Sequence, residues 1–399
     1  MNNAACTIVS KNYFAYAKTL KDSFLKNHPD NKFYILIVDL KDDEFLKDCR
    51  EHDVMWVEDL EIPNFLSYAF RYDILELNTN VKPTLLRRLL TVHQKVLYLD
   101  PDIEVFQPLD LIYGRLDTSS VVLTPHITRP ITDSMKPGED SFLQAGDFNL
   151  GFVGVKADET GNAFLTWWQE RCLEVGYNDL SVGLFVDQKW ANLVPCLFPD
   201  VHVERSVSCN MAYWNLHERA LEFIGGKWIV NGSTPLLFFH FSGLNLKDRN
   251  QISKYQDRFD LKKRPDLLPL FDTYRDKLAA NRFDHFLKYP YSFGKFSDGS
   301  EISPLARRVY SIAPSSFAAE NPFSEDSDVF AFCKKKKLFG VAPKTYTTYN
   351  TNNNDVRLKI FRSILKFARF FLGNERYLLL LRYMLYIAPV RRQKEIFFD

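Results

Sequence analysis

Short hydrophobic runs alternate with amphipathic segments over the first sixty residues of the chain. Three runs are typical of buried strands, and they are separated by two segments whose apolar residues recur at helical spacing. The expected strands are residues 6–10, 33–38 and 54–57, and the expected helices are residues 13–27 and 42–52. This alternation predicts an α/β fold with a mostly parallel central sheet and right-handed crossovers.

A further apolar run at residues 95–99 leads directly into Asp100-Pro101-Asp102. A continuous apolar run is typical of a buried parallel strand, and proline prevents a helix from following it. Residues i and i+2 of an extended chain project to the same side, so Asp100 and Asp102 are expected to point together from the carboxyl end of this strand. Ligands of open α/β sheets bind outside that end, and two carboxylates there suit Mg²⁺ or Mn²⁺. A solvated Asp-Pro-Asp turn is the alternative.

The middle of the chain continues the same alternation. Helices are expected at residues 67–77, 82–91, 159–175 and 185–197, and strands at residues 121–124 and 236–243. Residues 125–146 contain three prolines and little periodicity, which predicts a long loop. Loops of this length inside a compact domain are usually functional or disordered.

The charge of the chain is unevenly distributed. The 399 residues carry a net charge of +1, but residues 334–399 hold 15 Lys and Arg against 4 Asp and Glu, a net +11 that leaves −10 on the rest. A basic end on an acidic body indicates an anionic partner for that end. No recognised nucleic-acid-binding module accompanies this charge, so a membrane surface is the favoured partner and no nucleic acid is expected.

Several common classes of protein are excluded by missing patterns. The six cysteines form no C-x-x-C pair, and neither a G-x-G-x-x-G fingerprint nor a P-loop occurs. The first ten residues do not resemble a signal peptide. No apolar run approaches the length of about 18 residues that a spanning helix needs. We therefore expect a cytoplasmic protein, peripheral at the inner face of the cytoplasmic membrane if its C-terminal region binds lipid.

Four short motifs follow one another in an order that resembles the retaining glycosyltransferases of family 8, such as glycogenin and bacterial lipopolysaccharide galactosyltransferases. The motifs are Tyr98-Leu99-Asp100-Pro101-Asp102, Phe148-Asn149-Leu150-Gly151, Asp187-Gln188 and His240-Phe241-Ser242-Gly243. The resemblance covers roughly residues 5–250 and implies a GT-A-type, single Rossmann-like domain. It also implies a nucleotide-sugar donor, with a UDP-sugar favoured, and Mn²⁺ or Mg²⁺ as cofactor.

The resemblance assigns roles to individual residues of this chain. Asp100, Asp102 and His240 match the metal ligands, Asp187 matches a residue that binds donor-sugar hydroxyls, and Gln188 matches its neighbour near the anomeric carbon. The other donor contacts implied are Ile8, Asn12, Asn149 and Gly151, with Lys82 and Lys247 as candidate cations for the diphosphate. The chain departs from the family pattern at Lys189, which replaces an aspartate, and in the residues that follow His240.

Each assignment has a structural alternative. Asn12 is equally consistent with a helix N-cap, and Asp187 with an exposed helix N-terminus, where a negative charge is favourable. His240 alone would more often be a buried core histidine. Arg71 is an alternative to Lys82.

The predicted domain organisation has four parts. Residues 1–250 form the catalytic domain and residues 251–312 an aromatic extension of it on the acceptor side. Residues 313–343 form a linker, and residues 344–399 form a basic helical region. Within that region residues 356–387 predict a basic amphipathic helix or helical pair, the pattern of helices that lie on anionic membranes. Packing on the catalytic domain or on a second subunit is the alternative.

The predicted function is metal-dependent transfer of a sugar from a nucleotide sugar to a glycan or lipid-linked acceptor, with retention of anomeric configuration. Surface polysaccharide biosynthesis, including that of lipopolysaccharide, is the expected setting. A sugar nucleotidyltransferase and a non-catalytic glycan-binding or scaffold protein are the alternatives.

Overall fold

The computed structural model describes residues 3–50, 52, 54–318, 321–340 and 356–398. The chain divides into two compact units, Met1–Ile62 with Ile74–Ser292, and Pro63–Asp73 with Phe293–Asp399. The first unit contains all the residues predicted to form the site, except for the alternative cation Arg71, which belongs to the second unit.

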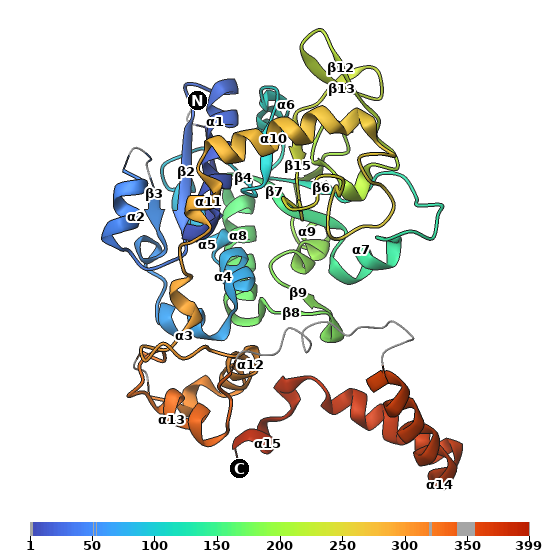
Figure 1. Ribbon diagram of the computed structural model, residues 1–399. Helices are drawn as coiled ribbons and strands as arrows, with labels where there is room; N and C mark the ends of the chain where they lie inside the picture. The colour runs from blue at the N-terminus through green and yellow to red at the C-terminus, as the bar shows by residue number, and fades with distance from the viewer. Residues whose placement is uncertain (1–2, 51, 53, 319–320, 341–355, 399) are drawn as a thin grey trace. The chain divides into compact units, whose positions relative to one another are not determined.

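A seven-stranded sheet forms the centre of the first unit, in the order β10-β6-β7-β4-β1-β2-β3 (Figure 1). Its strands are β1 (Asn3–Val9), β2 (Lys32–Ile37), β3 (Val54–Trp56), β4 (Lys95–Leu99), β6 (Val121–Pro125), β7 (Phe148–Lys156) and β10 (Val201–Val203). Neighbouring strands are parallel except at β7, which runs antiparallel to both β4 and β6. The predicted α/β class with a mostly parallel sheet is therefore confirmed.

The helices of the first unit pack around this sheet and around the smaller sheet described next. They are α1 (Phe14–Asn27), α2 (Asp43–Asp48), α4 (Ile74–Asn80), α5 (Lys82–Leu90), α6 (Asp110–Thr118), α7 (Glu139–Ala145), α8 (Glu159–Val175), α9 (Val194–Leu197), α10 (Leu268–Ala280) and α11 (Phe283–Phe286). One core joins α1 and α6 to β1, β2 and β4, with Phe24, Leu97 and Ile112 fully buried in it. The continuous apolar runs of the strands are explained by burial on both faces.

A second, three-stranded sheet lies next to the end of β4. It consists of β11 (Met211–Ala212), β15 (Phe238–His240) and β5 (Ile103–Val105), with β15 antiparallel to β5 and His240 opposite Ile103. This pairing brings a histidine from late in the chain to the turn between β4 and β5. A hairpin of β12 (Leu221–Ile224) and β13 (Lys227–Val230), joined by β14 (Thr234–Pro235), and a small pair, β8 (Asn178–Asp179) and β9 (Leu184–Phe185), complete the strands of this unit.

The structure corrects four local predictions. The long loop expected at residues 125–146 contains the helix α7. Asp100-Pro101-Asp102 is a turn rather than an extended segment, because the Ile103 amide donates to the Asp100 carbonyl at 3.1 Å. The helix expected at residues 185–197 is interrupted: Val186 has a φ of 42°, and only the short turn η4 (Lys189–Leu193) and α9 follow. The helix expected at residues 67–77 is two helices, α3 (Phe65–Arg71) and α4.

The second unit is built from α3, α12 (Pro304–Ile312), α13 (Asp328–Lys335), α14 (Val356–Ile387) and α15 (Lys394–Phe398). Phe70 packs edge-to-face on Tyr310 and Phe323, and the buried guanidinium of Arg307 donates to the carbonyls of Ala69, Phe70 and Tyr72. Residues 293–312 thus belong to this unit, whereas residues 251–292 belong to the first. Residues 319–320 and 341–343 of the predicted linker, and 344–355 and 399 of the predicted C-terminal region, lie outside the described residues.

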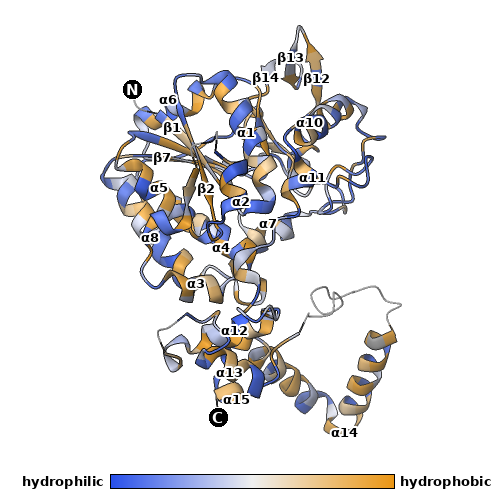
Figure 2. Ribbon diagram, turned by 60° about the vertical axis from the view of Figure 1, so that its left-hand side comes forward, coloured by the Kyte–Doolittle hydropathy of each residue, from blue (hydrophilic) through white to orange (hydrophobic). Residues whose placement is uncertain are grey.

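Two helices make up α14, because Gly373 interrupts it with a φ of 73°. Of the two predicted forms, a single helix or a helical pair, the structure has the pair, and much of it is coloured hydrophobic in Figure 2. Among the described residues, no helix is sufficiently long and apolar to cross a membrane.

Candidate active site

Polar residues collect at one edge of the central sheet. Ser10, Asp100 and His126 each follow the last residue of a parallel strand, β1, β4 and β6. Because β7 is antiparallel, its first residues, including Asn149, lie at the same edge. This is the edge at which open α/β sheets bind their ligands.

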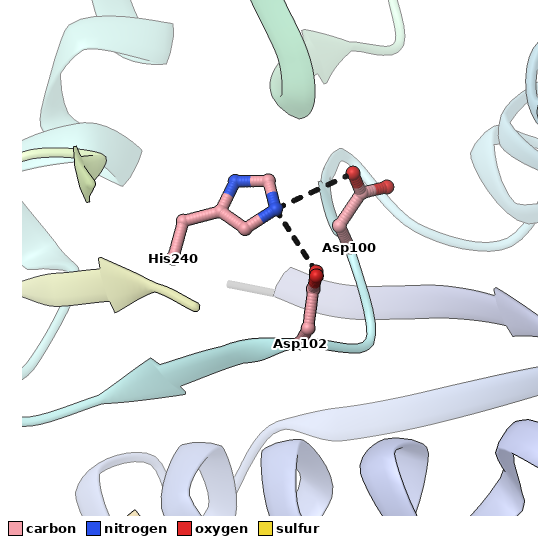
Figure 3. Close-up of side chains that lie close together, drawn as sticks. All are labelled: Asp100, Asp102 and His240. Atoms are coloured by element: carbon pink, nitrogen blue, oxygen red, sulfur yellow. Dashed lines mark ion pairs between the residues drawn. The ribbon is translucent and has the colours of Figure 1, made fainter. Parts of the chain in front are cut away.

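Asp100, Asp102 and His240 converge at this edge (Figure 3). The His240 Nε2 atom lies 2.9 Å from Asp102 Oδ1 and 3.7 Å from Asp100 Oδ2. One ligand atom from each residue lies within 4.8 Å of the other two, and no other such cluster of three His, Cys, Asp or Glu residues occurs in the described part of the chain. Two carboxylates and one imidazole fit a divalent ion such as Mn²⁺, which accepts both oxygen and nitrogen ligands.

Neighbouring side chains orient these three residues. The Tyr98 hydroxyl donates to Asp100 Oδ1 at 2.8 Å, which leaves Asp100 Oδ2 facing His240. The Trp214 ring packs edge-on against the His240 ring, with centroids 5.2 Å apart. Burial opposes protonation of His240, but the carboxylates of Asp102 and Asp100 outweigh it and raise the pKa of the imidazole. The two carboxylates therefore favour a positive charge at this point, either a proton on His240 or a cation bound by the neutral imidazole.

Gly151 makes room for this cluster. A Cβ atom at this position would lie 2.4 Å from His240 Cε1 and 2.8 Å from Asp100 Oδ2. The Asp100 amide also donates to the Gly151 carbonyl at 2.7 Å, which holds the two backbones together. Gly151 was predicted as a donor contact, and the structure gives this glycine a further role: any larger residue would collide with two of the three converging side chains.

Asp187 and Lys82 form an ion pair behind the cluster. The Lys82 Nζ atom lies 2.6 Å from Asp187 Oδ2, donates to the Leu150 carbonyl at 2.8 Å, and lies 4.2 Å from the centroid of the Tyr98 ring. Both charged side chains are buried, and burial raises the pKa of Asp187 against the opposing effect of Lys82. Lys82, proposed for the diphosphate, is therefore placed against Asp187 and does not line the cleft described below. Asp187 is a buried partner rather than an exposed helix terminus, so that alternative is wrong.

Gln188 and Asn149 meet in a shared hydrogen-bond network. The Gln188 Oε1 atom accepts from the Leu150 amide at 3.2 Å, while its Nε2 atom donates to the Ala145 carbonyl at 3.1 Å. Asn210 donates from Nδ2 to Asn149 Oδ1 at 3.0 Å. The network fixes the side chains of both predicted donor contacts and ties them to the last residue of α7.

His126 connects this network to the loop at residues 125–146. Its ring stacks on Phe142 of α7 and packs edge-on against Trp214, and its Nδ1 atom lies 3.2 Å from the Asp147 carbonyl. Burial lowers the pKa of His126 to about 4, so the ring is neutral at neutral pH. Trp214 contacts both His126 and His240 and so links the loop to the converging cluster.

A cleft of about 500 Å³ opens beside the cluster and is lined by Ile8, Asn12 and Asn78 as well as Asp100, Asp102 and His240. The Asn78 Nδ2 atom donates to the Ser10 hydroxyl at 2.9 Å. The Oδ1 atoms of Asn12 and Asn78 are both buried without a hydrogen-bond partner in the part of the chain that the structure describes. Asn12 lies inside the turn η1 (Lys11–Tyr13) and no side chain caps α1, so the N-cap alternative is wrong.

The mouth of the cleft combines exposed aromatic rings with a lysine. Tyr13 and Tyr255 are 44% and 54% exposed, and Lys254 lies with its Nζ atom 4.9 Å from the centroid of the Tyr255 ring. Lys247, predicted to reach the diphosphate, is exposed but does not line the cleft.

Sequence reasoning missed His126, Asn210, Trp214 and Lys254. His126 could have been found, because it directly follows the predicted strand at residues 121–124, as Asp100 follows its own strand. The other three are brought to the site by loops and short turns that no periodicity signals.

Comparison with known proteins gives distant similarities. No model of a known protein family matches the chain, so the resemblance to family 8 stays a prediction. Two uncharacterized proteins of Bacillus subtilis (strain 168) are similar: YfnF is 28% identical over 265 residues, covering 64% of this chain and 86% of its own length. YfnD is 28% identical over 247 residues, covering 60% of this chain and 77% of its own.

Two solved structures are also distantly similar to this chain. The galactosyltransferase LgtC, in complex with donor and acceptor sugar analogs, aligns with a TM-score of 0.41 at 14% identity, over 69% of this chain and 95% of that one. The glycosyltransferase GlyE of Streptococcus pneumoniae TIGR4 aligns with a TM-score of 0.42 at 16% identity, over 74% and 67%. The functional assignment therefore depends on the residues of the cleft.

Proposed function

We propose that this protein is a metal-dependent glycosyltransferase of GT-A type that moves a sugar from a nucleotide sugar to a glycan or lipid-linked acceptor. One observation carries the proposal. Asp100, Asp102 and His240, from segments up to 140 positions apart in the sequence, converge at the ligand-binding edge of the sheet beside a cleft of about 500 Å³. Clefts of that volume are typical of small-ligand sites.

Asp100, Asp102 and His240 would hold the divalent ion, with Mn²⁺ favoured over Mg²⁺ because one ligand is a nitrogen. Such an ion, when bound, stabilises negative charge on the diphosphate of the departing nucleotide. The protein supplies the geometry: Tyr98 fixes one oxygen of Asp100, and Gly151 leaves the space in which the three side chains meet.

The unpartnered amide oxygens of Asn12 and Asn78 support the binding of a nucleoside in the adjacent part of the cleft. Buried acceptors need donors, and the N–H groups of a base or the hydroxyls of a ribose supply them. A UDP-sugar is the favoured donor.

Asn149, Asp187 and Gln188 are buried and, like Lys82, do not line the cleft. The resemblance to family 8 gives them the role of orienting the transferred sugar. The Lys82 ammonium lies 2.6 Å from Asp187 and makes its carboxylate a poor nucleophile, which supports same-face displacement with retention rather than a covalent intermediate. The leaving phosphate would then accept the proton of the incoming acceptor hydroxyl. The fixed position of Gln188 suits it to stabilise charge at the anomeric centre.

A panel of nucleotide sugars tests this function. Purified protein with Mn²⁺ is expected to release nucleoside diphosphate from one of them, and EDTA is expected to stop the release. Asp102→Asn should lower the rate at least about a hundredfold, whereas Asp30→Asn, which changes an exposed carboxylate elsewhere, should not. Metal-independent release, or full activity of Asp102→Asn, would overturn the proposal. With the active donor, the anomeric proton signal of the product in NMR reports retention or inversion.

The C-terminal helical pair would place the enzyme on an anionic membrane surface, facing a lipid-linked acceptor of surface polysaccharide synthesis. Four basic residues share one stripe of the first helix: Lys359, Arg362, Lys366 and Arg369. The opposite face exposes large apolar side chains: Ile360, Ile364, Phe367 and Phe371. No Asp or Glu occurs in residues 356–372. A helix with a basic stripe on one side and an apolar face on the other fits the boundary between anionic headgroups and acyl chains. A second copy fits less well, because its own basic stripe would repel this one.

Sedimentation with vesicles tests this placement. Binding is expected to phosphatidylglycerol vesicles but not to phosphatidylcholine alone, and Lys366→Glu/Arg369→Glu should abolish it. Lys262→Glu/Lys263→Glu, the same charge change at exposed positions of the first unit, should not. Two results would contradict a membrane surface as the partner: vesicle binding that survives Lys366→Glu/Arg369→Glu, or light scattering that shows a dimer of the wild type in the absence of vesicles.

A further inference from the structure

A second pocket of about 360 Å³ lies in the first unit and shares no lining residue with the cleft. Its walls come from α1, β5, α10 and the hairpin of β12 and β13. None of the motifs used so far accounts for it.

An aromatic pair forms one wall. Phe223 and Trp228 stand directly opposite each other across the hairpin, with ring centroids 4.8 Å apart, and both line the pocket. Gly225 and Gly226, with φ values of 59° and 79°, form the tight turn that brings the strands together. Such a pair stabilises a hairpin in any case. Phe223 nevertheless remains 61% exposed, so much of its surface is available to a ligand.

Polar side chains that are held by hydrogen bonds or ion pairs to one another also line the pocket. Glu104 is only 2% exposed and is ion-paired with Lys277 of α10, which opposes the effect of burial on its pKa. Asn281 donates from Nδ2 to the Thr19 hydroxyl at 3.0 Å and to Asp22 Oδ2 at 3.2 Å. Fixed carboxylate, hydroxyl and amide groups of this kind can exchange hydrogen bonds with a ligand rich in hydroxyls.

Two further lysines add positive charge at the pocket. Lys26 and Lys227 both line it and are exposed, and neither side chain makes a hydrogen bond or ion pair within the described residues. Lys26 is close enough to lower the pKa of Glu104 through its charge. With Lys277 neutralised by Glu104, these two ammonium groups are available for an anionic substituent.

We propose that this pocket is a second carbohydrate site, for a sugar that carries a carboxylate or phosphate group. The aromatic pair would pack on the apolar face of the ring, Asp22 and the groups beside it would bind hydroxyls, and Lys26 and Lys227 would bind the acidic substituent. Glu104 follows Asp102 by two residues, about 7 Å along the chain. An acidic glycan held here would lie close to the strand that supports the catalytic edge without entering the donor cleft. The site does not depend on the proposed function, since binding alone reveals it.

Saturation-transfer NMR and calorimetry on the full chain test this proposal with three probes: a disaccharide containing glucuronic acid, neutral maltose, and inorganic phosphate. The acidic disaccharide is expected to bind at least about tenfold more tightly than either other probe. Lys26→Gln/Lys227→Gln should weaken binding of the acidic disaccharide about tenfold or more. Phe223→Ser should remove saturation transfer from the protein to the sugar-ring protons. Lys254→Gln, which changes the lysine of the other cleft, should leave this binding unchanged.

The lysine substitutions are at exposed positions, so they keep the test interpretable if Phe223→Ser perturbs the hairpin. Three results would overturn the proposal: no binding of the acidic disaccharide, unchanged affinity in Lys26→Gln/Lys227→Gln, or loss of binding in Lys254→Gln. Phosphate binding as tight as that of the acidic sugar would also overturn it, because the pocket would then be a simple anion site.

Discussion

Replacing Gly151 by alanine tests the geometry of the metal site without removing any ligand. The new Cβ atom would lie 2.4 Å from His240 Cε1 and 2.8 Å from Asp100 Oδ2 and Asn149 Oδ1, closer than such contacts allow. The backbone cannot retreat easily, because the Gly151 carbonyl accepts from the Asp100 amide at 2.7 Å. His240 or Asp100 must therefore move. Overpacking of this kind costs about 1–3 kcal/mol, and a displaced ligand weakens metal binding about 10–100-fold.

Electron paramagnetic resonance measures this loss directly, since the signal of free Mn²⁺ disappears on binding. Gly151→Ala should show the weakened titration while its thermal unfolding remains cooperative. Gly114→Ala is the matched control, because among the described residues no atom beyond its own helical turn lies within 4 Å of a Cβ at that position. If Gly151→Ala bound Mn²⁺ as tightly as wild type, the three side chains would not be the metal ligands in the geometry described.

Three further predictions concern groups around the site. Lys82→Met should lower the free energy of unfolding in urea by about 3–5 kcal/mol, because it leaves Asp187 buried without a partner. Lys82→Met/Asp187→Leu should recover much of this lost stability. If the losses of the two single variants simply added up in the double variant, the ion pair would be refuted. His126 has a folded pKa of about 4 against 6.5 ordinarily, so the unfolded chain binds the extra proton and stability falls as pH drops from 6.5 towards 4, by up to about 3 kcal/mol. Urea unfolding at pH 7 and 4.5 should show this slope, and His126→Gln should flatten it. Arg258→Gln removes the paired hydrogen bonds to Asp133, at 2.8 and 2.9 Å, and should speed limited proteolysis of the loop at residues 125–146; an unchanged cleavage rate would contradict that anchoring role.

The central sheet could be predicted because burial of both its faces gives continuous apolar runs. Asp100 can be predicted from the sequence as well, since it is a carboxylate directly after a buried strand. His240 was found only through the order of the motifs, because its approach to Asp102 depends on the pairing of β15 with β5, which no local pattern encodes.

The remaining features depend on tertiary contacts. Lys82 is predicted to face a diphosphate, but the packing of α5 against β4 and α8 buries it against Asp187, which sequence spacing cannot reveal. The segment at residues 185–197 has helical periodicity, yet Val186 adopts a φ of 42° where Asp187 meets that lysine. Asn210 and Trp214 reach the site through loops, so only the fold identifies them.

The most direct test of the central claim is a Mn²⁺ titration of the full chain with and without a nucleoside diphosphate. If Asp100, Asp102 and His240 hold an ion that also contacts the diphosphate, wild type should bind Mn²⁺ more tightly when UDP is present, and His240→Ala should lose both the binding and the enhancement. Equal Mn²⁺ affinity in wild type and His240→Ala would contradict the account.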